Sequence, residues 1–306
     1  FTNSGAESNE AALKLARRYW STVRERPERT GILAFHASFH GRTMATVTLT
    51  GQPKYHKGFE PMLPGIHYAT FDDLESVKAA LDEAGDTIGT ILLEPVQCEG
   101  GLRVPTPGFL PALRALCDER DLLLAFDEVQ TGVGRCGTWF AYEDEGVRPD
   151  IMSLAKGLGG GVPLGAMVTT EEVAEGFQPG SHASTFGGNP LATRAGLEVV
   201  RTIEEEGLLE RASTVGAYLA EGLEQITRNH AERCVEVRGR GLLFGLELQT
   251  AEDDTLGKRV VAAGLERGLL LNAIQGKVLR FTPPLILERH HVDQVVDSLD
   301  AILGGV

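Results

Sequence analysis

The chain has 306 residues, 42% of them hydrophobic and 24% charged, which is the composition of an ordinary globular protein with room for one large domain or two smaller ones. Its formal net charge of -14 argues against nonspecific nucleic-acid binding, because that binding needs a basic surface. No apolar run approaches the ~20 residues that a membrane-spanning helix requires.

The four cysteines, Cys98, Cys117, Cys136 and Cys234, have neither C-x-x-C spacing nor zinc-site spacing, and we expect reduced thiols in a cytosolic protein. His36 and His40 are spaced like metal ligands on a helix, but they flank a strand-to-loop stretch, so no metal site is predicted. No signal peptide opens the chain. It begins without Met, and we interpret it as part of a longer protein.

The first motif is the turn Asn3–Glu7, which precedes an amphipathic helix predicted over Glu10–Tyr19. Small residues at a helix N-terminus leave backbone N–H groups free to hold a phosphate. A plain capped surface helix is the alternative.

A strand predicted over Gly31–Ala37 is followed by Phe39 and Arg42. A phenylalanine at a strand exit can stack on another flat ring, and the planar arginine side chain can bind a carboxylate through two hydrogen bonds. For Arg42 the alternative is a surface salt bridge.

The next stretch, 50–69, is rich in proline and glycine and is interpreted as a loop. Helices are predicted over Leu74–Asp82 and Pro111–Arg120, with a buried strand over Thr90–Leu93 between them. Two acids, Glu94 and Glu99, follow that strand. We interpret Glu94 as structural. Strands alternating with helices predict a parallel sheet.

The central stretch, 122–166, contains two short apolar runs. Leu122–Phe126 ends at Asp127, and Ile151–Leu154 ends just before Lys156. Ligands bind at the carboxyl ends of parallel strands, where these runs place one carboxylate and one amine. Pyridoxal phosphate needs a lysine for its Schiff base and an acid that keeps its ring nitrogen protonated. The alternative is an acid that caps a strand and a solvated loop lysine.

The remaining elements predict a smaller α+β domain after a glycine-rich loop that contains Ser184 and Thr185. A serine and a threonine in such a loop can bind phosphate or only form turns. Arg280 lies on a short strand before Pro283–Pro284. The predicted elements are a strand at 163–169, helices at 191–205 and 208–229, and strands at 235–237, 243–248, 269–272 and 278–281.

The motifs FDEVQTG and DIMSLAKGLGGGVPLGAM resemble those of the fold-type I, class III pyridoxal-phosphate aminotransferases, and the resemblance runs along the whole chain. It implies an α/β fold with a mostly parallel sheet and helices on both faces, plus a smaller C-terminal α+β domain. The large cofactor-binding domain would span 1–190, lacking a preceding N-terminal segment. The interdomain helix and the small domain would span 191–306.

The resemblance also assigns roles to individual residues. Lys156 and Asp127 would be catalytic. Phe39 would cover the pyridine ring, Arg42 and Arg280 would bind substrate carboxylates, and Glu99 would pair with Arg280 from the other domain. The implied cofactor-binding residues are Ser4, Gly5, Ala6, Phe39, His40, Asp127, Glu128, Val129, Gln130, Lys156 and Thr185; the implied substrate-binding residues are Arg42, Glu99, Ser184 and Arg280.

The implied reaction transfers the terminal amino group of N2-acetylornithine to 2-oxoglutarate, with pyridoxal 5'-phosphate as cofactor, in the cytoplasm. The protein would be a homodimer in which the loop with Ser184 and Thr185 enters the partner's site. Ornithine, succinylornithine and 4-aminobutyrate stay open as alternative donors. The alternative outside enzymes is a fragment that binds no cofactor and acts as a folding or interaction unit.

Overall fold

The computed structural model describes residues 1–250 and 255–305, and the chain forms two compact units. Unit 1 comprises Phe1–Cys98, Pro105–Val133 and Phe140–Arg201, and unit 2 comprises Glu99–Val104, Gly134–Trp139 and Thr202–Val306. The chain passes from one unit to the other within helix α6 (Pro190–Glu205), after Arg201. The predicted domains, 1–190 and 191–306, stay a prediction. The compact units differ from them in two ways: the boundary falls after Arg201, and the short segments Glu99–Val104 and Gly134–Trp139 belong to unit 2.

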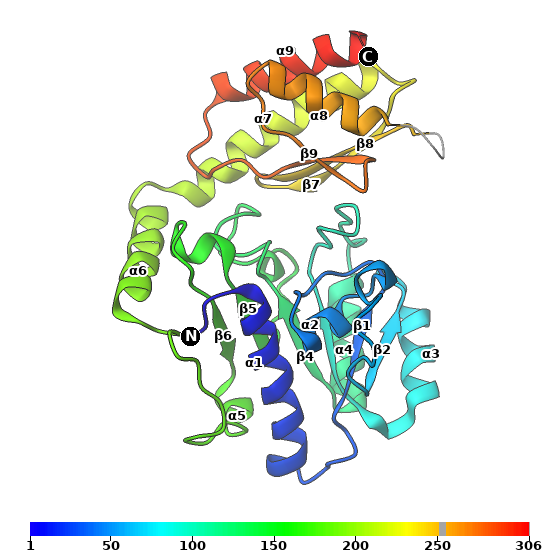
Figure 1. Ribbon diagram of the computed structural model, residues 1–306, viewed down its shortest axis with the longest axis vertical. Helices are drawn as coiled ribbons and strands as arrows, with labels where there is room; N and C mark the ends of the chain where they lie inside the picture. Colours follow the sequence, from blue (N-terminus) through cyan, green and yellow to red (C-terminus); the bar gives the residue numbers. More distant parts are fainter. Residues whose placement is uncertain (251–254, 306) are drawn as a thin grey trace. The chain divides into compact units, whose positions relative to one another are not determined.

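Within the described residues, unit 1 has a six-stranded sheet with the order β2-β1-β3-β4-β5-β6 (Figure 1). All neighbouring strands are parallel except β6, which runs antiparallel to β5. No crossover helix separates β5 from β6, and a parallel pair needs such a connection. The strands are β1 (Gly31–Phe35), β2 (Ile66–Ala69), β3 (Ile88–Leu93), β4 (Leu123–Asp127), β5 (Ile151–Leu154) and β6 (Ala166–Thr169).

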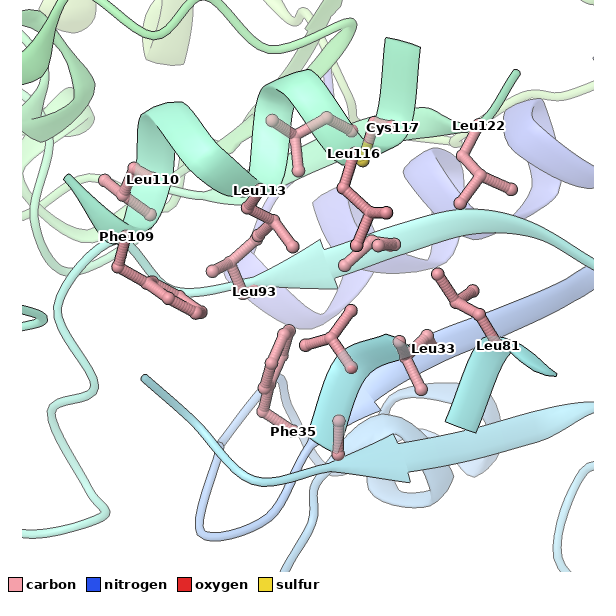
Figure 2. Packing of buried hydrophobic residues seen from close by; sticks show 14 of the residues in the cluster. Leu33, Phe35, Leu81, Leu93, Phe109, Leu110, Leu113, Leu116, Cys117 and Leu122 are labelled. Carbon is pink, nitrogen blue, oxygen red and sulfur yellow. The ribbon is translucent and has the colours of Figure 1, made fainter. Parts of the chain in front are cut away.

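Helices cover both faces of this sheet, as the apolar runs predict for strands buried on two sides. Along β1, Leu33 and Phe35 pack toward α3 (Leu74–Ala84) and α4 (Phe109–Arg120), as Figure 2 shows. The alternate residues Ile32 and Ala34 pack against α1 (Gly5–Arg18). The shorter helices of unit 1 are α2 (Met44–Leu49) and α5 (Glu171–Ala174).

Unit 2 has an antiparallel sheet with the order β7-β8-β10-β9 among the residues described. One face of this sheet packs on α7, α8 and α9 around a single apolar cluster. The elements are α7 (Leu208–Asn229), β7 (Cys234–Arg240), β8 (Leu243–Leu248), α8 (Leu256–Glu266), β9 (Asn272–Ile274), β10 (Val278–Phe281) and α9 (Arg289–Gly305). The predicted fold class, a mostly parallel α/β sheet plus a smaller α+β part, is confirmed.

One local interpretation differs from the structure. The stretch 50–69 was interpreted as a loop, but its last residues form the edge strand β2. Proline and glycine recur through that stretch and indicate a loop, whereas the four strand residues at its end pair with β1 at the edge of the sheet. The four cysteines are buried free thiols. In the described part of the chain, no helix is both long and apolar enough to span a membrane.

Candidate active site

The carboxyl ends of β4 and β5 bring Asp127 and Lys156 to one edge of the sheet. Asp127 is the last residue of β4 and lies opposite Ser153 of β5. Lys156 follows β5 by two residues, and its backbone has φ +40°. Its exposed amine donates a hydrogen bond to the side-chain oxygen of Gln130, three residues after Asp127. The acid and the lysine singled out in the sequence therefore belong to one cluster.

Asp127 is 4% exposed, and three donors hold its carboxylate. Nδ2 of Asn9 and Nδ1 of His40 each lie 2.7 Å from Oδ2. The backbone N–H of Val129 donates to Oδ1 at 3.0 Å. These bonds compensate the cost of burying a charge and fix the orientation of the carboxylate. His40, predicted to bind the cofactor, orients the acid, and its buried Nε2 has no partner within the described residues.

The N-terminus of α1 packs against the same strand ends. Ser4 caps this helix by accepting the N–H of Glu7 at 3.2 Å, and Ser8 Oγ donates to the carbonyl of Leu154 at 2.9 Å. A Cβ on Gly5 would lie 2.7 Å from Cγ1 of Val129, so only glycine permits this approach. The free N–H groups and the positive end of the helix dipole can bind an anion here.

The loop after β1 carries Phe39 and Arg42. The guanidinium of Arg42 lies 4.1 Å from the ring centre of Tyr55 and 5.5 Å from that of Phe39, which is cation–π geometry. Gly41 of this loop faces α1, because a Cβ there would lie 2.7 Å from Cβ of Ala6. The predicted phosphate turn and the predicted ring-and-arginine loop are therefore neighbours.

Two further glutamates surround Asp127. Glu94 is fully buried and accepts the N–H groups of Phe39 at 3.1 Å and Cys98 at 3.3 Å. Burial raises the pKa of Glu94 to about 7. Glu128 accepts the N–H of Tyr142 at 3.0 Å and the hydroxyl of Thr131. The position of Glu94 accords with the structural role predicted for it.

In the glycine-rich loop, the hydroxyl of Ser184 is hydrogen-bonded, whereas Thr185 is exposed. Ser184 Oγ accepts a hydrogen bond from the side chain of Asn3 at 3.0 Å and from the N–H of Gly187 at 3.1 Å. Thr185 is exposed. Both line a cavity of about 380 Å³ together with Thr2, Asn3, Glu7 and Glu10. Within this chain, neither hydroxyl has a hydrogen bond to Ser4, Gly5 or Ala6 among the contacts of the described residues.

Glu99 and Arg280 form an ion pair within unit 2, with Nη1 of Arg280 2.5 Å from Oε1 of Glu99. The side chains are 31% and 17% exposed, respectively. The sequence placed Glu99 in the domain opposite Arg280. In the structure, Glu99–Val104 groups with unit 2, so the pair lies inside one compact unit and joins residues 181 positions apart.

Sequence reasoning missed Asn9, which donates to both Asp127 and the carbonyl of His40. Its side chain is almost completely buried. Asn9 stands among Ala12, Leu13 and Ala16 on the buried side of α1. A polar residue at an apolar position of an amphipathic helix was the available signal.

The residues present fit pyridoxal phosphate. A buried, oriented carboxylate suits a protonated ring nitrogen, an exposed lysine amine suits a carbonyl carbon, and the start of α1 suits a phosphate. No cluster of three or more His, Cys, Asp or Glu side chains suited to a metal ion occurs in residues 1–250 and 255–305.

Comparison with known proteins supports this interpretation. The family model for Aminotransferase class-III matches residues 1–303. The chain is 48% identical to an acetylornithine aminotransferase of Aquifex aeolicus over 99% of this chain and 76% of that protein. It is 47% identical to an acetylornithine aminotransferase of Caldanaerobacter subterraneus, over 100% of this chain and 75% of that protein. Among solved structures, the chain superimposes on an ornithine aminotransferase of Toxoplasma gondii with a TM-score of 0.93 and 33% sequence identity. The match covers 99% of this chain and 71% of that one, whose structure has partial occupancy of PLP at its active site.

Proposed function

The chain belongs to the class III aminotransferases, and from that premise we propose that it transfers the terminal amino group of N2-acetyl-L-ornithine to 2-oxoglutarate. The products are N-acetyl-L-glutamate 5-semialdehyde and L-glutamate, in arginine biosynthesis. The observation that carries this choice of substrate is the identity of 47–48% with acetylornithine aminotransferases over nearly the whole chain. The similarity to an ornithine aminotransferase, at 33% identity, is weaker.

The cofactor is pyridoxal 5'-phosphate, which when bound supplies a protonated ring that takes up the electron pair left on the substrate carbon after proton loss. Ser4, Gly5 and Ala6 would hold its phosphate at the start of α1, and Phe39 would cover its ring. The carboxylate of Asp127, whose Oδ2 is held by Asn9 and His40 at 2.7 Å, would keep the ring nitrogen protonated. Glu128, Val129 and Gln130, which follow β4 directly, would line the rest of the cofactor site.

Lys156 is the covalent anchor and the proton carrier. Its Nζ takes the proton from the substrate carbon that bears the amino group, and it returns a proton to the keto acid in the second half-reaction. Because the Lys156 side chain is exposed, its amine can move between the two positions that these roles require.

Two arginines distinguish the substrates. Arg42 holds the distal carboxylate of either substrate through paired hydrogen bonds. Glutamate has a second carboxylate beside its reacting carbon, and acetylornithine reacts at a carbon that has none. Glu99 occupies Arg280 during the first half-reaction and releases it for the glutamate carboxylate in the second. Ser184 lies beside the substrate.

A paired assay tests this function. The purified protein with pyridoxal phosphate and 2-oxoglutarate should use acetylornithine with a higher kcat/KM than succinylornithine, ornithine or 4-aminobutyrate. Preference for one of the other amines would replace the donor while keeping the reaction. A colourless protein that shows no new absorbance with added cofactor would support the interaction-unit alternative.

The active form is a homodimer, with the loop of Ser184 and Thr185 completing the partner's site. Exposed apolar side chains in and after this loop support this assembly, because a contact surface would bury them; they are Phe186 (70% exposed), Leu191 (75%) and Leu197 (45%). A cytoplasmic location accords with the four buried free thiols.

Mixed dimers test the sharing of sites. Lys156→Ala and Thr185→Ala homodimers should each be weak. After subunit exchange, each heterodimer regains one intact site, so random mixing should restore about a quarter of the parent activity, as two-fold symmetry dictates. Exchange without recovered activity would mean that each site is formed by one chain.

A further inference from the structure

The turn that carries Glu99 is attached to the sheet of unit 2 by Arg238 of β7. The side chain of Arg238 is 18% exposed. Its Nε donates to the carbonyl of Leu102 at 2.7 Å, and its Nη2 donates to the carbonyl of Gly101 at 2.5 Å. One planar guanidinium therefore holds two successive carbonyls of the segment Glu99–Val104, an arrangement that the single ammonium of lysine reproduces poorly.

Strand register explains how this segment comes to lie on Arg280. Gly245 of β8 lies opposite Arg238 on one side and opposite Arg280 on the other. Directly opposed residues point to the same face of a sheet. The two arginines therefore flank Gly245 on one face, roughly 10 Å apart by two strand spacings. The neighbouring residues Phe244 and Leu246 point into the apolar cluster on the other face.

The absence of a side chain at Gly245 makes room for the turn. A Cβ at this position would lie 3.1 Å from Cβ of Leu102 and 2.9 Å from Cγ1 of Val278. Leu102 is fully buried although its φ is +53°, and Gly101 before it has φ +106°. A left-handed leucine is disfavoured, so the turn keeps this shape through its contacts with Arg238 and with the face around Gly245.

Two acids keep Arg238 from acting as a second carboxylate-binding site. Glu247, 16% exposed, lies 2.6 Å from Nη1, and Glu236 lies 2.5 Å from it. Burial by itself would raise the pKa of Glu247, but hydrogen bonds from Lys277 and Arg238 hold that pKa below its usual value. Arg238 is thus neutralised on one side while its remaining N–H groups face the turn.

We propose that Arg238 is a positioning residue for the Glu99–Arg280 pair. It fixes the carbonyls of Gly101 and Leu102, and this places the Glu99 carboxylate on Arg280 while the amino donor binds. Glu99 then releases Arg280 by rotation of its own side chain, with the turn staying on unit 2. This inference rests on the roles proposed above for Glu99 and Arg280.

Separate single-turnover measurements of the two half-reactions test the proposal in the holoenzyme. Arg238→Ala should raise the ratio of kcat/KM for glutamate to that for acetylornithine by about three- to thirty-fold, in the same sense as Glu99→Ala, because a misplaced acid leaves Arg280 free. The Arg238→Ala/Glu99→Ala double variant should not exceed Glu99→Ala alone, since the turn acts through Glu99. Arg238→Lys should fall between Arg238→Ala and the parent.

Glu236→Gln is the matched control, because it removes an exposed partner of Arg238 (56% exposed) and leaves the bonds to the carbonyls. Its ratio should stay within about two-fold of the parent, as for most surface changes. Equal losses in both half-reactions for Arg238→Ala, with additive effects in the double variant, would overturn the positioning role.

Hydrogen–deuterium exchange gives a readout that needs no turnover. Arg238→Ala should speed amide exchange in peptides covering Glu99–Val104 by about ten-fold or more, while β8 keeps its protection. Unchanged exchange in that segment would overturn the proposal. A parent enzyme inactive on acetylornithine would refute the proposed function, and the exchange result would still decide whether Arg238 holds the turn.

Discussion

Two carboxylates, one in each unit, are held in contrasting ways. Asp127 in unit 1 is 4% exposed and receives hydrogen bonds from Asn9, His40 and Val129. Glu99 in unit 2 is 31% exposed and pairs with Arg280. A buried carboxylate with three donors is costly to displace, whereas a partly exposed ion pair is weaker because water screens it. The first arrangement suits a carboxylate that stays in place, and the second suits a carboxylate that must release its arginine partner.

The same contrast holds for the surrounding backbone. Asp127 ends a central strand between β3 and β5, so its position is fixed by the core of unit 1. Glu99 stands on a turn that side-chain bonds from Arg238 attach to an antiparallel sheet. Changes in the first region should impair both half-reactions together, and changes in the second should separate them.

The largest effect is expected for Lys156→Ala, which should lower both half-reactions by at least about a thousand-fold, because the covalent anchor and the proton carrier are lost together. Borohydride reduction and peptide mapping of the parent should place the pyridoxyl adduct on Lys156. Lys78→Ala, an exposed lysine paired with Glu75, is the matched control and should keep parent activity. An adduct on Lys14 or Lys54 would contradict the assignment.

Asp127→Asn should keep the cofactor bound but lower both half-reactions by about ten-fold to a few hundred-fold. An amide cannot hold the ring proton, and loss of a charge-assisted bond costs about 1.5–3 kcal/mol. Stopped-flow spectra of each half-reaction measure this. Asp118→Asn, at an exposed ion pair with Arg114, should change little. A variant within about two-fold of the parent would remove Asp127 from this role.

Glu99→Ala should separate the half-reactions. Free Arg280 binds the α-carboxylate of glutamate more tightly, and it draws acetylornithine into the wrong orientation. An arginine exposed to a carboxylate is worth about 1–3 kcal/mol, which corresponds to a several-fold to hundred-fold change. Single-turnover rates should move in opposite senses. Equal loss in both would show that Glu99 only supports the fold.

The smallest effect concerns stability. The pKa of Glu94 is raised from 4.5 to about 7, so the folded state binds a proton that the unfolded state has released between these values. Its stabilising contribution is complete below about pH 4.5 and declines as the pH rises through 7. Relative to that of Glu94→Gln, the free energy of unfolding of the parent should fall by up to about 1 kcal/mol per pH unit between pH 4.5 and 7. Urea unfolding at several pH values measures the difference; parallel curves would mean that Glu94 stays ionised.

Much of the secondary structure in both units followed from local sequence. The runs before Asp127 and Lys156 are short and mostly apolar. That pattern is typical of strands buried on both faces of a sheet. The helix predicted over 208–229 is α7 with the same bounds, because its buried positions recur at the helical period. Asp127 ends β4 and Lys156 follows β5, so the apolar runs and the motif together predicted that the two residues lie near each other.

Other features depend on residues far apart in the chain. Asn9 reaches Asp127 across 118 positions, and Leu102 lies over Gly245 because the register of β7, β8 and β10 places that glycine between two arginines. Period and composition fix which residues are buried within an element. Tertiary packing alone decides which strands become neighbours and in what register, and hence that Glu99–Val104 folds with unit 2, because the free energy of those contacts depends on geometry that no local pattern contains.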